Sequence, residues 1–115
     1  MGSADRRGRK AERLAAWLLM LKGYRILARR FASPVGEIDL IARRGDLLLF
    51  VEVKRRDSLE TAAAALRPAQ QRRIGRAAEA FLRDRPELAA LRLRFDLVLV
   101  TPGRLPRHLP DAWRP

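Results

Sequence analysis

The residues with the clearest chemical potential are two carboxylates and a lysine in the stretch GEIDLIARRGDLLLFVEVKRR, residues 36–56. Asp39 lies in its first half, and Glu52 and Lys54 lie in its second half. Carboxylate oxygens are ligands for hard divalent cations such as Mg²⁺, and a nearby lysine can contact a phosphate. If the fold brings these three side chains together, they predict a metal-assisted site for phosphate chemistry.

Two strands joined by a tight turn would bring them together. β-Branched and aliphatic residues predict strands over 37–44 and 47–54, and Gly45-Asp46 between them suits a type II′ turn. That turn sets three pairs opposite each other: Ile41 and Phe50, Asp39 and Glu52, and Glu37 and Lys54. Because side chains alternate between faces, the two carboxylates and the lysine then share one face. A shift of one residue in the register would separate the carboxylates.

Two interpretations of this charged face are open. In one it is solvated, and Lys54 pairs with Glu37. In the other it is covered, because the same face carries Ile41 and Phe50 near the turn. Carboxylates about 5 Å apart on paired strands repel each other, and a bound cation would turn that cost into a gain. Since buried carboxylates without partners are costly and mark functional sites, the covered face favours a metal site.

The composition limits the classes of function that the protein can have. The chain has 115 residues, which predicts a single domain over 1–115. Its 25 basic and 13 acidic residues give a net charge of +12, which favours a nucleic-acid partner; an anionic membrane surface or codon bias are the alternatives. The absence of cysteine excludes disulfides and thiolate sites and fits a cytoplasmic location. The apolar run 14–21 is too short to span a bilayer, so we expect no membrane association.

Hydrophobic periodicity, together with the positions of glycine and proline, predicts the remaining elements. We expect helices at about 9–22 and 68–84, strands at 24–31 and 92–101, and a loop at 32–35. Residues 1–8 should be frayed, and 58–66 fit either a helix or a loop. Residues 102–115 hold four prolines, which predict a packed tail, anchored by Trp113, without a long regular element. The order predicts an α/β fold with an αβββαβ core, in which helices flank a central four-stranded mixed sheet.

The helices should each bury one face. In the first helix Leu14, Trp17, Leu18 and Leu21 form a stripe, and its second half is apolar nearly all round, which predicts burial. Glu12, one turn earlier, has an ordinary explanation as a charge near a helix N-terminus. In the second helix, the core stripe is Ile74, Ala77, Ala78 and Phe81. The arginines on its other side form either a solvated face or a phosphate-contacting face.

Six segments, in order, resemble the YraN-like family of small bacterial proteins: GRKAERLAAWLLMLKGYRILARRF, GEIDLIA, FVEVKRR, QQRRIGRAAEAFL, RFDLVLV and HLPDAW. Asp39 with Glu52-Val53-Lys54 is similar to the D…ExK signature of the restriction-endonuclease-like, PD-(D/E)xK, nuclease superfamily, which includes archaeal Holliday-junction resolvases. The resemblance implies a restriction-endonuclease-like fold. It also implies a Mg²⁺- or Mn²⁺-dependent endonuclease that hydrolyses phosphodiester bonds, in DNA rather than RNA, by structure rather than sequence. A non-catalytic nucleic-acid-binding module on the same fold is the alternative.

The resemblance also implies residue roles. Asp39 and Glu52 become metal ligands, with the Val53 carbonyl as a third ligand and Glu37 as an outer one. Lys54 orients the attacking water or stabilises the phosphate, and Glu12 and Gln70 reach the site from the two helices. Nucleic-acid contacts are expected from Arg29, Arg30, Arg55, Arg56, Arg72, Arg73 and Arg76. The family usually has lysine at Gln70 and asparagine at Arg30. A homodimer is expected if both strands of a duplex are cut.

Overall fold

The computed structural model describes residues 3–57 and 66–115, and of residues 3–7 it describes only the helical backbone. The predicted segment 58–66 therefore lies almost entirely outside the described residues. The elements are α1 (Ser3–Leu21), β1 (Arg25–Ser33), β2 (Gly36–Arg44), β3 (Leu47–Arg55), α3 (Pro68–Arg83), a 3₁₀ turn (Pro86–Leu88), β4 (Arg92–Val100) and β5 (Arg107–Trp113).

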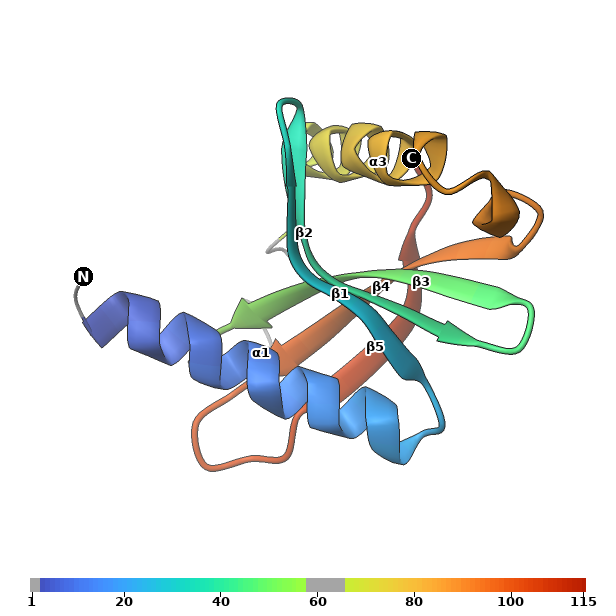
Figure 1. Cartoon of the computed structure of the whole chain (residues 1–115). Coiled ribbons are helices and arrows are strands. Elements are labelled where there is room, and N and C mark those ends of the chain that lie inside the picture. Colours follow the sequence, from blue (N-terminus) through green and yellow to red (C-terminus); the bar gives the residue numbers. More distant parts are fainter. Residues whose placement is uncertain (1–2, 58–65) are drawn as a thin grey trace.

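The strands form one mixed sheet with the order β1-β2-β3-β4-β5. β3 and β4 are parallel, and their connection passes through α3; the other neighbours are antiparallel. Figure 1 shows α1 and α3 on opposite sides of this sheet. The predicted α/β class and mixed sheet are confirmed, but the predicted count of four strands is wrong, because the sheet has five.

The fifth strand comes from the proline-rich tail. β5 pairs antiparallel with β4 from Leu99↔Arg107 to Phe95↔Trp113, with an irregularity between. Pro110 is tolerated because β5 is an edge strand, where a missing N–H leaves no ladder bond broken. Asp111, with φ of 52°, adds a kink. The predicted docking of Trp113 is confirmed, since its ring is buried 5.5 Å from that of Phe95.

The core on the α3 side is aromatic. All four residues of the predicted α3 stripe are buried, so that prediction is confirmed. Phe81 of α3 makes edge contacts with Phe31 and Phe50, and Phe50 stacks on Phe95. Ile38 also packs in this cluster, whereas Leu40, two residues further along the same strand, packs on the other side of the sheet.

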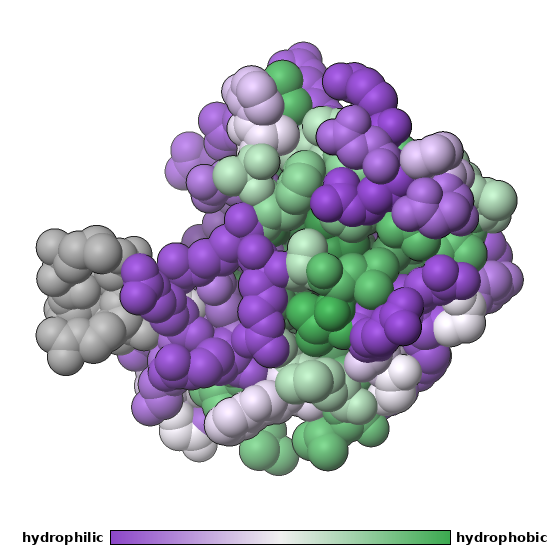
Figure 2. Space-filling model, viewed as in Figure 1, coloured by the Kyte–Doolittle hydropathy of each residue, from purple (hydrophilic) through white to green (hydrophobic). Residues whose placement is uncertain are grey.

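The core on the α1 side is aliphatic, and its helix face differs from the predicted one. Small side chains of α1 lie against the sheet, and the buried ones are Ala11, Ala15, Ala16 and Leu19. Trp17 and Leu21 point to solvent, with 57% and 86% of their surface exposed. The predicted stripe is therefore wrong at both positions. Figure 2 shows hydrophobic side chains reaching the surface near α1 and β1, between hydrophilic bands. Alanines let the helix backbone approach the aliphatic face of the sheet closely, which larger residues would prevent.

The start of the first helix also differs from prediction. α1 begins at Ser3, so residues from Ser3 to Gly8 are helical rather than frayed. No described helix is long and apolar enough to cross a membrane.

The hairpin of β1 and β2 bends toward α3 (Figure 1). The predicted loop at 32–35 is a tighter turn, because β1 continues to Ser33, which pairs with Gly36. A Cβ atom on Gly36 would lie 2.7 Å from the backbone oxygen of Arg73 in α3. Glycine is required there for this close approach, which holds the bent hairpin against α3.

Candidate active site

The β2–β3 hairpin has the predicted register. Gly45 has a φ of 60° and Asp46 does not have a positive φ, which fits the predicted type II′ turn. The ladder runs from Arg44↔Leu47 to Leu40↔Val51. It ends there, so the predicted backbone pairs of Asp39 with Glu52 and of Glu37 with Lys54 are wrong.

The strands diverge at Asp39, and its side chain replaces the next ladder bond. The backbone N–H of Val53 donates to Asp39 Oδ2 over 2.8 Å. The carboxyl group of Asp39 therefore lies against β3 and close enough to Glu52 for a hydrogen bond between the two carboxyl groups. The side chains meet as predicted, although the backbones do not pair.

Both carboxyl groups are held in an unfavourable environment for charge. Burial, followed by the negative charge of Glu52, raises the pKa of Asp39 to about 7. The Val53 N–H opposes this shift, and the charge of Glu12 adds to it. Burial also raises the pKa of Glu52, with Lys54 as the main opposing influence. The raised pKa values mean that neither neighbouring carboxyl group ionises easily. A cation bound between them would stabilise their charged forms.

Lys54 and Gln70 both contact Glu52. Lys54 Nζ lies 3.1 Å from Glu52 Oε1, and the side-chain amide of Gln70 donates to the same oxygen over 3.1 Å. Gln70 therefore reaches the site from α3, as predicted. The two contacts fix the orientation of the Glu52 carboxylate.

Glu12 approaches from α1 and is paired with an arginine. Arg30 Nε donates to Glu12 Oε2 over 2.7 Å. Arg30 has a φ of 51°, in the left-handed region that favours glycine and asparagine and is uncommon for arginine. Arg30 was predicted to contact nucleic acid, but in the structure its guanidinium holds Glu12 beside the carboxyl pair.

Glu37 is not joined to this group. It is exposed on β2, opposite Ala32 of β1. Within the described residues no hydrogen bond or ion pair connects it to Asp39 or Glu52, so an outer-ligand role for it stays a prediction.

The donors available to a metal are few. Among the described residues no group of three or more acidic, histidine or cysteine side chains could hold a metal ion. Asp39 and Glu52 supply two carboxylates, and the backbone carbonyl of Val53 is a further oxygen. This set still fits Mg²⁺, which keeps several waters and takes one or two carboxylates together with substrate phosphates.

The arginines predicted to contact nucleic acid lie in different parts of the structure. Arg72, Arg73 and Arg76 lie on the exposed face of α3, and Arg29 and Arg55 are exposed on their strands. Arg56 is close enough to Glu52 for its charge to oppose the raised pKa of that carboxyl group.

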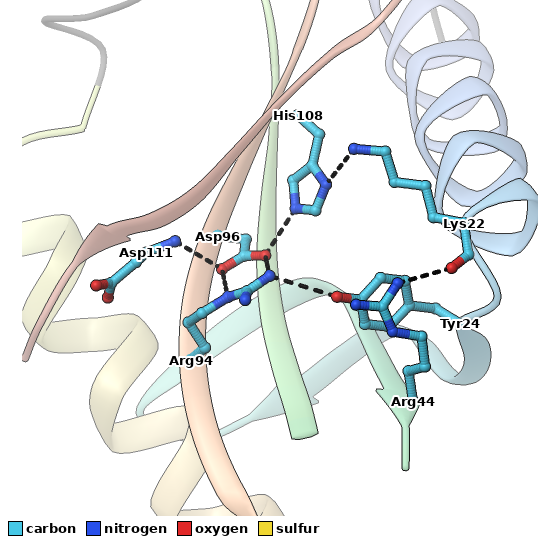
Figure 3. Close-up of polar contacts among 7 residues, drawn as sticks. All are labelled: Lys22, Tyr24, Arg44, Arg94, Asp96, His108 and Asp111. Atoms are coloured by element: carbon cyan, nitrogen blue, oxygen red, sulfur yellow. Dashed lines mark hydrogen bonds and ion pairs between the residues drawn. The ribbon is translucent and has the colours of Figure 1, made fainter. Parts of the chain in front are cut away.

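A second carboxylate centre was missed by sequence reasoning (Figure 3). Asp96 of β4 is completely buried. Its oxygens accept two bonds of 2.9 Å from the guanidinium of Arg94, one of 2.7 Å from His108 Nε2 and one of 3.0 Å from the Asp111 N–H. Burial alone would raise the pKa of Asp96, but these hydrogen bonds outweigh it and lower the pKa. An acidic residue two positions after an arginine in β4, and the single histidine of the sequence, were the available signals.

The same network ties the end of α1 to the sheet. Lys22 Nζ lies 2.9 Å from His108 Nδ1. Because an ammonium can only donate, Nδ1 accepts and Nε2 carries the proton that goes to Asp96. Arg44 donates to the Lys22 carbonyl over 2.8 Å, and its guanidinium lies 4.4 Å from the centre of the Tyr24 ring. Figure 3 shows these groups converging from α1, β2, β4 and β5.

Fold and site together define an α/β protein with a carboxylate–lysine group where two central strands diverge. The chain belongs to the family described as uncharacterised protein family UPF0102, whose model matches residues 11–100. It is 60% identical to a UPF0102 protein of Paramagnetospirillum magneticum, over 97% of this chain and 90% of that protein. Identity is 58% to the relative from Parvibaculum lavamentivorans, over 98% of this chain and 85% of that protein. A relative from Brucella canis is also 58% identical, over 90% and 82%.

Proposed function

We propose that this protein is a metal-dependent nuclease that hydrolyses phosphodiester bonds in DNA, on a fold of the restriction-endonuclease-like type. The observation that carries the proposal is the half-buried carboxyl group of Asp39, which accepts from the Val53 N–H beside the buried Glu52, with Lys54 Nζ 3.1 Å from Glu52. A site selected only for stability would avoid two neighbouring carboxyl groups with raised pKa values.

Mg²⁺ or Mn²⁺ would be held by Asp39, Glu52 and the Val53 carbonyl. When bound, such an ion supplies an activated water and neutralises charge on a phosphate oxygen. The protein's own residues do the positioning. Gln70 orients Glu52, and Lys54 offers a fixed positive charge to a phosphate oxygen in the transition state.

DNA binding is supported by charge. The net charge of +12 and the exposed arginines of α3 suit contacts to the phosphate backbone. Such contacts position a nucleic acid without reading bases, so we expect recognition of structure rather than sequence. Because one such site cuts one strand, cleavage of both strands of a duplex would need two copies of the chain.

A non-catalytic nucleic-acid-binding module is the second candidate. The observation in its favour is that the Lys54 ammonium group itself compensates the charge of Glu52. This candidate predicts salt-sensitive binding without turnover.

The test is cleavage of supercoiled, branched and single-stranded DNA with Mg²⁺ or Mn²⁺. We expect Asp39→Asn, Glu52→Gln and Lys54→Met each to lower the rate by at least about a hundredfold. The matched control is Asp46→Asn, which removes an exposed carboxylate from the β2–β3 turn, where it pairs with Arg92. Cleavage that survives Asp39→Asn and Lys54→Met would identify a contaminant, and binding without cleavage would favour the second candidate.

A further inference from the structure

A basic cavity lies on the α1 side of the sheet, between α1 and the turn that follows β4. It encloses about 280 Å³, and its charged lining residues are Lys10, Arg55 and Arg104. Thr101 also lines it. Among the residues that the structure describes, no acidic one is part of the lining.

The local sequence explains how these cations converge. Arg104 N–H donates to the Thr101 carbonyl over 3.1 Å, which closes a four-residue turn. Pro102 occupies its second position and Gly103, with φ of 76°, its third, as a type II turn requires. Arg55 pairs with Val100 on the neighbouring strand, directly before this turn. The turn thus brings Arg104 back to the cavity that Arg55 and Lys10 line.

Within the described residues, the cations that line the cavity lack a carboxylate partner, and one hydroxyl group lacks a hydrogen-bond partner. In the described part of the chain, no carboxylate forms an ion pair with Lys10, Arg55 or Arg104. The Thr101 side chain is buried, with 5% of the residue exposed, and its hydroxyl has no hydrogen-bond partner among the described residues. Lys10, Arg55 and Arg104 are exposed and place three positive charges around one cavity. An oxygen-rich anion would neutralise these charges, and guanidinium groups match a phosphate well.

The basic lining continues along α1. A neighbouring cavity of about 530 Å³ shares Arg104 and adds Lys22 and Arg107. Figure 1 shows the connection between β4 and β5 running beside α1. Two basic cavities joined at one arginine suit a chain of phosphates better than a single small anion.

We infer that the cavity lined by Lys10, Arg55, Arg104 and Thr101 binds a backbone phosphate of a single nucleic-acid strand. Arg55 directly follows Lys54 in β3, and successive side chains of a strand lie on opposite faces. A strand that passes the candidate active site can therefore cross the end of β3 and enter the cavity. The nucleic-acid identity of the phosphate rests on the proposed function.

The inference is tested by binding without catalysis. The affinity of a fluorescently labelled single-stranded oligonucleotide is measured in EDTA over a range of salt. We expect Lys10→Gln, Arg55→Gln and Arg104→Gln each to weaken binding about tenfold and to lower the salt slope by about 0.7. The matched control is Arg25→Gln, which removes an exposed arginine at the start of β1, away from the cavity, and should change affinity less than about twofold.

Thr101→Val separates binding from folding. It removes an enclosed, unpaired hydroxyl and no charge, so the melting temperature should stay unchanged or rise, and oligonucleotide affinity should change less than about twofold. Inorganic phosphate serves as competitor. Displacement of the oligonucleotide only by a large excess supports a strand phosphate, whereas equal affinity for the two overturns that assignment.

The outcomes also distinguish this inference from the nuclease proposal. If the three charge variants bind like the wild type while Asp39→Asn abolishes cleavage, the cavity inference is wrong and the nuclease proposal is untouched. If no DNA is cleaved but the variants lose affinity, the nuclease proposal fails and the phosphate site stands.

Discussion

Asp39 and Asp96 lie on strands of the same sheet, yet their surroundings are opposite. Asp96 is fully buried and surrounded by donors from Arg94, His108 and Asp111, which lower its pKa. Asp39 is less buried, accepts one backbone N–H and lies against another carboxyl group, and its pKa is raised to about 7. The more deeply buried carboxylate is thus the better compensated one.

This difference separates a structural role from a functional one. The Asp96 network joins α1, β4 and β5 and leaves none of its oxygens without a donor. The charges of the Asp39–Glu52 pair contribute little to stability that a neutral amide would not provide. The pair can still bind an added cation. Position in the core therefore says less about a carboxylate's role than the balance of its partners does.

The largest expected effect is the loss of stability on replacing Asp96. Asp96→Asn removes the buried carboxylate that accepts hydrogen bonds from the half-buried Arg94 and from His108, and we expect a cost of about 3–5 kcal/mol in the free energy of unfolding. Urea denaturation measures it, with Asp39→Asn as the matched substitution that should not destabilise the protein. Equal destabilisation by the two variants would contradict the contrast drawn between them.

An intermediate effect is expected from pH. Between about pH 4 and pH 7 folded Asp39 retains a proton that the unfolded chain has released, so stability falls as pH rises through this range. We expect a loss of about 2 kcal/mol between pH 5 and pH 8 in the wild type and a smaller one in Asp39→Asn, measured by denaturation at each pH. Asp96 acts in the opposite direction: its lowered pKa contributes stability that is lost only as pH falls below about 4. If the stability of the wild type rises from pH 5 to pH 8, the raised pKa assigned to Asp39 is wrong.

The smallest effect is expected at Arg30. Arg30→Asn suits the φ of 51° better and relieves about 1 kcal/mol of strain, but it removes the Glu12 ion pair, worth up to about 1 kcal/mol. The net change in stability should stay below about 1 kcal/mol. Freed from Arg30, the charge of Glu12 should raise the pKa of Asp39 further, which carboxyl NMR titration can measure. A lower pKa for Asp39 in this variant would contradict the position assigned to Glu12.

Local chemistry made the centre of the fold predictable. The Gly45-Asp46 turn determined the hairpin register, and period-3.6 spacing identified the buried stripe of α3 and the inward position of Gln70. These features depend on neighbours in sequence, where turn type and periodicity act directly.

Features that depend on distant contacts were not predictable in the same way. Proline content argued against a strand at 107–113, but an edge position tolerates Pro110. The burial of Trp17 was predicted from an all-round apolar helix, whereas the sheet packs against the alanine face of α1. The Asp96 network includes contacts between residues up to 86 positions apart in sequence, and strand alternation alone gave no reason to place His108 beside Asp96. The divergence of β2 and β3 after Leu40 also separated Glu37 from Lys54.

The two tryptophans experience opposite surroundings. Trp113 is enclosed among rings on the α3 side, and Trp17 stands in water on the outer surface of α1. The chain thus carries two native optical reporters. A Trp17→Phe variant would emit at short wavelength from the interior, and a Trp113→Phe variant would emit at long wavelength from the helix surface, so that core opening and surface occupancy can be followed separately without an attached dye.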